Sequence, residues 1–272
     1  MGWYASALTL CYNINTHQTA MSKAMLRLST GKRINSAADD PAGLCISQGM
    51  ESQIRGMNVA KRNIQDAVSM IQTADGALGS VHSILQKLNE LAVQSATGTT
   101  TDEDRKNSNE VFKSLVEGLD DICRESEFNT QKLFSTDEKI NIQVGANAGQ
   151  IMTIEKKKID SSTLGLDKLD ISTEEGASKA IDTIKKAISS VSSQRSMLGA
   201  MENRLECTSD YLDNSILNLT EAQSRIMDAD MAEEIMNFAR ESLLSQVSNF
   251  LLSSYIKQQE SMLQLLLSLS NR

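Results

Sequence analysis

One stretch decides the fold: residues Asn58–Ala96 read NVAKRNIQDAVSMIQTADGALGSVHSILQKLNELAVQSA. Apolar residues recur in it every seven positions, and others fill the alternate steps of three and four: Ile64, Ile71, Leu78, Leu85 and Ala92, with Val68, Val81 and Leu88 between them. This heptad pattern predicts a long helix that lies against a partner helix in a left-handed coiled coil.

The second half of the chain supplies the partner. Its apolar residues are again spaced by threes, fours and sevens: Leu198, Met201, Leu205, Leu212, Ile216, Leu219 and Ile226. We therefore expect a mainly α-helical protein, a long antiparallel coiled-coil helical bundle that forms a rod, with paired terminal helices. The only clear alternating segment lies near residues 139–155 and predicts one small β-hairpin around a glycine-bearing loop.

Local signals mark where the helices begin and end. Gly31, followed by two cations, predicts a helix end, and Asp40-Pro41 predicts the start of the next helix. A third helix is expected to begin near Thr101 and to run to about Cys123, and residues 172–175 match a capping box ahead of the second seam.

Both chain ends carry more apolar side chains than one helix pair can bury. Between Leu243 and Leu269 these side chains fall on more than one helical face, and the N-terminal segment is their more polar companion. Each contributes about 1.5–3 kcal/mol when fully buried, so we expect other copies of the same chain to cover them. The residues expected to pack in this way are Leu8, Met21, Met25, Leu28, Leu243, Val247, Phe250, Leu251, Tyr255, Leu263 and Leu266.

Composition excludes several classes of protein. The 272 residues include 27 Lys and Arg against 35 Asp and Glu, for a net charge of −8. This acidic balance argues against a nucleic-acid partner, because phosphate contacts need clustered cations. No window holds the roughly 18 apolar residues that a membrane span requires, and the chain start lacks the pattern of an ordinary secretory signal.

No group of residues suggests catalysis. The two histidines, His17 and His82, are distant in sequence, and the four cysteines have no ligand spacing. The acidic residues between Asp228 and Glu234 are expected at a helix start, where they face the positive end of the helix dipole. We therefore expect no enzyme, no metal and no cofactor. The basic run Lys156–Lys158 is interpreted as a solvated loop face.

Several motifs resemble those of the bacterial flagellins. They are LSTGKRINSAADDPAGL at residues 28–44, QVGANAGQ at 143–150, LGAMENRLE at 198–206 and RIMDAD at 225–230. The resemblance covers nearly the whole chain in order. It implies an inner terminal coiled-coil domain of residues 1–40 with 228–272, a helical rod domain of residues 41–227 and no outer variable domain.

The function that this resemblance implies is structural. A flagellin polymerises into the bacterial flagellar filament for motility, and it reaches the extracellular filament by type III export without a cleaved signal. Two alternatives stay open: a flagellar hook-filament junction protein, which shares the terminal helices, and an enzyme, for which no motif speaks.

The resemblance also implies partners. They are further copies of the chain in a helical homopolymer, an export chaperone at the C-terminal segment, the filament cap and hook-junction proteins, and an animal Toll-like receptor. The rod patch that would meet the receptor or a neighbouring copy comprises Gln86, Lys87, Asn89, Glu90, Leu91 and Gln94, with Glu110 on the next helix. Within it Asn89 replaces an arginine of the family pattern, and Lys87 keeps the charge of another.

Overall fold

The computed structural model describes residues 2–270, with side chains described from residue 7 to residue 264. Backbone contacts divide the chain into two compact units, one made of residues up to Ser52 and from Asn218 onward, the other of Gln53–Leu217. In chain order the elements are α1 (Gly2–Thr30), α2 (Pro41–Ser95), α3 (Asp102–Glu125), β1 (Glu127–Phe128), β2 (Gln131–Lys132), β3 (Lys139–Gln143), β4 (Ile151–Glu155), α4 (Ser161–Leu164), α5 (Glu174–Met227) and α6 (Met231–Ser270).

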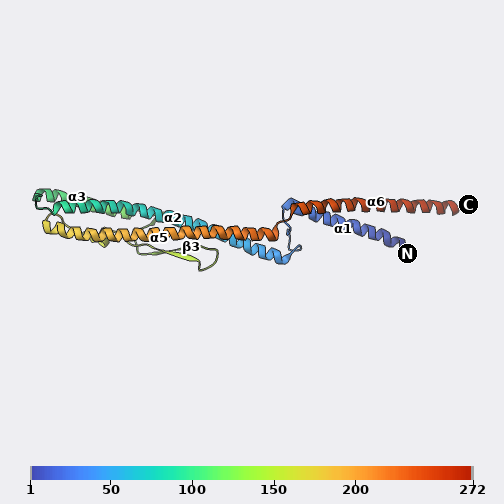
Figure 1. The fold of residues 1–272 in the computed structure, drawn as a ribbon, viewed down its shortest axis with the longest axis horizontal. Coiled ribbons are helices and arrows are strands. Elements are labelled where there is room, and N and C mark those ends of the chain that lie inside the picture. The colour runs from blue at the N-terminus through green and yellow to red at the C-terminus, as the bar shows by residue number, and fades with distance from the viewer. Residues whose placement is uncertain (1, 271–272) are drawn as a thin grey trace. The chain divides into compact units, whose positions relative to one another are not determined.

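Helices α2 and α5 form the antiparallel pair that the heptads predict (Figure 1). Polar contacts join them in register: Lys61 Nζ to Asp213 at 2.7 Å, Gln72 Nε2 to Glu202 at 2.8 Å, and the Arg195 guanidinium to Asp75 at 2.8 and 3.0 Å. From Lys61 to Asp75 the residue numbers increase along α2, and those of their partners on α5 decrease from Asp213 to Arg195. The pairing is therefore antiparallel, as expected.

The seam of α2 is almost the expected one. Its buried residues follow steps of three and four: Met57, Ala60, Ile64, Ala67, Ile71, Ala74, Leu78, Val81, Leu85, Leu88, Ala92 and Ser95. The sequence pattern placed Val68 in the seam, but Val68 is only half-buried. Ala67 occupies that seam position instead. Small alanines alternate with large residues along the first half of this seam, so the neighbouring helix can approach closely. On α5, Leu198, Leu205 and Leu212 are buried as predicted.

The predicted helix boundaries are confirmed. Gly31 follows α1 with φ +68°, which a residue with a side chain rarely adopts. Asp40 Oδ1 accepts hydrogen bonds from the backbone of the first turn of α2. Thr101 Oγ1 caps α3 by accepting from Asp104 N at 3.2 Å, and Thr173 Oγ1 caps α5 by accepting from Gly176 N at 3.2 Å.

The predicted hairpin consists of β3 and β4, which pair antiparallel from Lys139 opposite Glu155 to Gln143 opposite Ile151. Its loop lies against α2, where a Cβ at Gly56 would come within 2.9 Å of the Ala146 Cβ. A second, shorter hairpin of β1 and β2 was not predicted. Its strands have two residues each, too few to show an alternating pattern.

In the other unit, α1 and α6 lie side by side (Figure 1). The connection after α1 is held by backbone hydrogen bonds to the end of α5 and to the short segment between α5 and α6. Arg33 N donates to Met227 O at 2.6 Å, and Ala229 N donates to Gly31 O at 3.0 Å. This short antiparallel bridge fixes where the two helices begin to pair.

Candidate functional site

The contact face of α6 toward α1 follows a heptad but is mostly polar. Its least exposed side chains are spaced by fours and threes: Glu234, Phe238, Glu241, Ser245, Ser248, Leu252, Tyr255 and Gln259. Five of these eight are polar. The facing positions of α1 are mostly apolar, among them Leu10, Ile14 and Ala24, so the seam joins a mostly polar face of α6 to an apolar face of α1.

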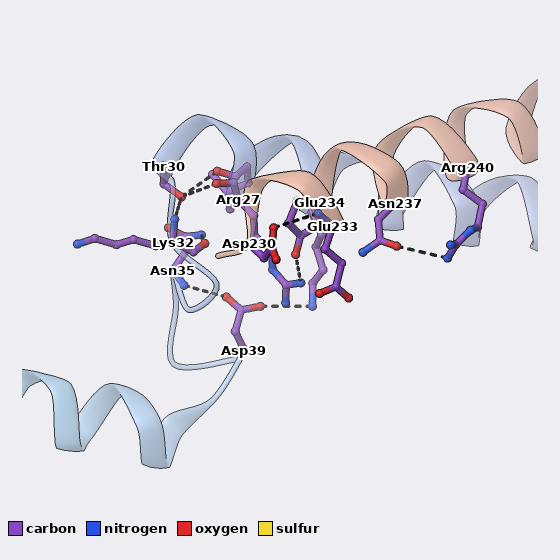
Figure 2. Close-up of polar contacts among 12 residues, drawn as sticks. Arg27, Thr30, Lys32, Asn35, Asp39, Asp230, Glu233, Glu234, Asn237 and Arg240 are labelled. Carbon is purple, nitrogen blue, oxygen red and sulfur yellow. Dashed lines mark hydrogen bonds and ion pairs between the residues drawn. The ribbon is translucent and has the colours of Figure 1, made fainter. Parts of the chain in front are cut away.

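Polar pairs take the place of some apolar contacts in this seam. Arg27 Nη1 donates to Glu234 Oε1 at 2.8 Å, and Glu234 is only 7% exposed (Figure 2). Further along the seam, His17 Nδ1 lies 2.7 Å from Glu241 Oε2. Because a buried carboxylate is costly without a partner, the Arg27–Glu234 pair fixes the register of α1 on α6.

The loop before α2 joins this arrangement through Asp39. One of its oxygens accepts hydrogen bonds from the Ser36 hydroxyl at 3.0 Å and from the backbone N of Asn35 and Ser36, and the other lies 3.4 Å from Lys23 Nζ. Figure 2 shows Asp39 beside Asn35. The Ser36 hydroxyl is the largest cause that holds the pKa of Asp39 below its ordinary value. We call Lys23, Arg27, Asp39 and Glu234 the polar clasp.

The acidic residues at the start of α6 have structural roles. Asp230 Oδ1 accepts from Ala232 N at 2.9 Å and Glu233 N at 3.3 Å, so it caps the helix (Figure 2). The backbone of Asp228 pairs with that of Lys32 in the antiparallel bridge, and its carboxylate accepts a hydrogen bond from the Ser224 hydroxyl. These contacts agree with the interpretation of this acidic segment as a helix start.

Many large apolar side chains of α1 and α6 lie outside the seam and are exposed. Phe250 is 71% exposed, Leu8 66% and Leu243 62%. We call these exposed large residues the outward stripe: Leu8, Tyr12, Met25, Leu26, Met231, Ile235, Met236, Leu243, Leu244, Val247, Phe250, Leu251, Ile256, Met262 and Leu263. A water-exposed set of this size is typical of a surface that another molecule covers.

The predicted packing residues divide between the two faces. Most of them belong to the outward stripe: Leu8, Met25, Leu243, Val247, Phe250, Leu251 and Leu263. Met21, Leu28 and Tyr255 are half-buried. The side chain of Leu266 lies outside the described part of the chain. The sequence analysis selected apolar residues and therefore missed the polar clasp. In the sequence, the carboxylates of the clasp look like ordinary solvent-exposed charges.

The predicted rod patch is a face of α2 with one residue on α3. Gln86, Lys87, Glu90, Gln94 and Glu110 are exposed. Asn89 and Leu91 are half-buried, and Asn89 Oδ1 has no hydrogen-bond partner among the described residues.

Among the residues that the structure describes, no cluster of three or more His, Cys, Asp or Glu could hold a metal ion. Within the same part of the chain, no helix has the length and apolar character of a membrane span. Cys123 is buried, and burial together with Asp120 and Asp160 raises the pKa of its thiol to about 12, so it stays protonated and unreactive.

Comparison with known proteins agrees with this architecture. The model of the bacterial flagellin N-terminal helical region matches residues 3–139, and that of the bacterial flagellin C-terminal helical region matches residues 181–266. A flagellin of Halalkalibacterium halodurans is 47% identical over 257 residues, which cover 93% of each chain. The chain belongs to the bacterial flagellin family.

This flagellin is a structural, non-enzymatic subunit of the extracellular flagellar filament. A flagellin of Bacillus subtilis is 37% identical in an alignment of 296 positions, gaps included. The alignment covers 96% of this chain and 97% of that one. These relatives decide between the sequence-based alternatives in favour of flagellin over a hook-filament junction protein.

Solved structures share the fold. A Bacillus cereus flagellin aligns with a TM-score of 0.50 and 29% identity over 56% of this chain and 88% of that chain. A putative flagellar hook-associated protein from Vibrio parahaemolyticus aligns with a TM-score of 0.60 over 70% of this chain and all of that one, but at 14% identity this likeness shows the fold alone.

Proposed function

We propose that copies of this flagellin assemble by burying the outward stripe of α1 and α6 against one another. In this proposal residues 1–40 with 228–272 act as the inner assembly domain, and residues 41–227 act as the surrounding helical domain. The observation that carries it is the reversed patterning of α6, which faces its own partner helix with polar side chains and faces water with apolar ones.

The energies favour association through this stripe. Six of its members alone, Leu8, Leu243, Val247, Phe250, Leu251 and Leu263, are between 49% and 71% exposed. At about 1.5–3 kcal/mol for each full burial, covering their exposed parts releases on the order of 5–10 kcal/mol. This energy is comparable to the rotational and translational cost of association.

The proposal is tested by making part of the stripe polar. The triple variant Leu243→Ser, Val247→Ser and Phe250→Ser changes only exposed side chains, so the monomer should keep its helix content. We expect its critical concentration for seeded filament growth to rise by at least about a hundredfold, because about 3–5 kcal/mol of burial is lost.

The matched control changes neighbouring polar residues on the same helix, Gln246→Ser and Asn249→Ser, which are also exposed. Its critical concentration should stay within about threefold of the wild-type value, because substitutions of exposed polar residues outside the outward stripe change the free energy little. Filament growth of the triple variant at the wild-type concentration, seen by sedimentation and electron microscopy, would refute the proposal.

We also propose that the C-terminal part of the stripe is held by a flagellar export chaperone before assembly, and that the filament cap and hook-junction proteins meet the same terminal helices after export. The support is again exposure, since an uncovered apolar helix face invites aggregation. In a pull-down with the cognate chaperone, the triple variant should lose binding and the polar control should keep it. Equal recovery of both would contradict this role.

For the rod patch on α2 and α3, we propose contact with a neighbouring copy or with an animal Toll-like receptor. The support is that five of its seven residues are exposed. Because Lys87 supplies its only cation, Lys87→Glu should reduce receptor signalling by about tenfold or more in a reporter-cell assay. Lys106→Glu, an exposed change outside the patch, should leave signalling unchanged, and an equal loss would contradict the assignment.

A further inference from the structure

A cleft of about 730 Å³ lies in the unit Gln53–Leu217. One wall is the segment that leaves β4, Lys156–Ile159, and the other is the face of α5 from Lys186 to Gln194. Its volume falls within the roughly 300–1,000 Å³ that small-molecule sites occupy.

The cleft is positively charged although the chain as a whole is acidic. Five lysines and three carboxylates line it: Lys139, Lys156, Lys157, Lys158 and Lys186 against Asp137, Glu138 and Glu155. The overall charge of the chain is −8. A local excess of cations against that background attracts anions to this one place.

Within the described part of the chain, two of these lysines form no ion pair, although, after Lys139, the charge of Lys157 is one of the causes that lower the pKa of Glu155. Lys139 lies 2.7 Å from Glu155, Lys158 lies 2.7 Å from Asp160, and Lys156 Nζ donates to a backbone oxygen. Lys157 and Lys186, one on each wall, form no ion pair among the described residues.

Hydroxyl and amide groups surround the same space. Ser189, Ser190 and Ser193 line the α5 wall. Gln194 also lines the cleft and is only 6% exposed, and its buried Oε1 has no hydrogen-bond partner among the described residues. A buried acceptor without a donor is unfavourable. Because the terminal torsion of glutamine is broad, a small turn of the amide would present Oε1 to a donor in the cleft.

We propose that this cleft binds a small phosphorylated polyol, such as a sugar phosphate. Its phosphate would lie between Lys157 and Lys186. Its hydroxyls would accept from and donate to the serines of α5, and one of them would supply the donor that Gln194 lacks. The chemistry requires both parts of the ligand, since a bare anion leaves the amide unpaired and a neutral sugar leaves the lysines unpaired.

Equilibrium dialysis of the full-length monomer at low salt tests this proposal, with glucose 6-phosphate as the probe and glucose and inorganic phosphate as comparisons. We expect saturable binding of glucose 6-phosphate, weaker by at least about tenfold for either comparison compound. The variant Lys157→Gln with Lys186→Gln should weaken binding of the probe by at least about tenfold. The control Lys168→Gln with Lys185→Gln removes the same charge from exposed positions outside the cleft and should leave the affinity within about twofold.

Gln194→Leu separates ligand contact from a role in helix packing alone. It should weaken the sugar phosphate about threefold or more and leave inorganic phosphate unchanged, whereas a packing role alone would alter thermal stability and neither affinity. The proposal is overturned by an absence of saturable binding, by equal affinity for inorganic phosphate, or by equal losses in the two lysine pairs.

Discussion

Two phenylalanines with opposite burial provide the sharpest test of the assembly surface. Phe112 in α3 is 1% exposed, and Phe250 in α6 is 71% exposed. Phe112→Ala leaves a cavity and should lower the free energy of unfolding of the monomer by about 3–5 kcal/mol. Phe250→Ala removes a side chain that already meets water and should change it by less than about 0.5 kcal/mol.

Although Phe250→Ala should have little effect on the stability of the monomer, it should have a large effect on polymerisation. Burial of its exposed 71% corresponds to about 2 kcal/mol, and each 1.4 kcal/mol is a factor of about ten. The critical concentration of Phe250→Ala should therefore rise about thirtyfold. Urea unfolding of the monomer and sedimentation of seeded filaments measure the two quantities. The reasoning fails if Phe250→Ala destabilises the monomer by more than about 1 kcal/mol or leaves the critical concentration within about threefold.

Three further results are expected. Glu234→Gln takes the carboxylate from Arg27 and should speed amide exchange in α1 about tenfold or more, whereas Glu221→Gln, from an exposed pair, should change exchange less than about twofold; equal effects would contradict the clasp. At pH 8 a thiol reagent should modify the three exposed cysteines and spare Cys123 until the chain unfolds, because the pKa of that thiol is raised to about 12; four fast thiols would be the wrong outcome. Burial raises the pKa of Asp160, but hydrogen bonds outweigh it and hold the pKa well below the ordinary 3.8. The carboxylate thus stabilises the fold above that value and loses this contribution as pH falls through the lowered pKa. Circular dichroism should show a shallower acid decline for Asp160→Asn, and an identical decline would count against this contribution.

The helical architecture could be predicted because its signals are repeated. The seam from Ile64 to Ala92 carries the same spacing over several turns, so one misplaced residue, Val68 for Ala67, did not change the outcome. Caps such as Asp40 are local and depend on few residues, and they too were predicted correctly. The β1–β2 hairpin has no such repetition, and its turn at Asn129 and Thr130 relies on positive φ angles that the sequence pattern does not announce.

The candidate sites were harder to predict because they depend on which face a helix turns inward. The apolar abundance of the C-terminal segment was plain, but the sequence does not reveal that Glu234 and Ser248 are buried while Phe250 is not. The lysine cleft was missed for a related reason. Lys157 and Lys186 are far apart in sequence, and only the fold places them on the walls of one space.

The division of α6 into two faces means that different kinds of selection act on alternate residues of the same helix. A library of α6 variants screened for soluble, helical monomer would be depleted at Glu234, Glu241 and Ser248, which meet α1. The same library screened for swimming would lose variants at Leu243 and Phe250 as well, although those residues are silent in the first screen. The positions depleted in the swimming screen but not in the monomer screen would identify the α6 residues that are needed only when many copies of the chain act together.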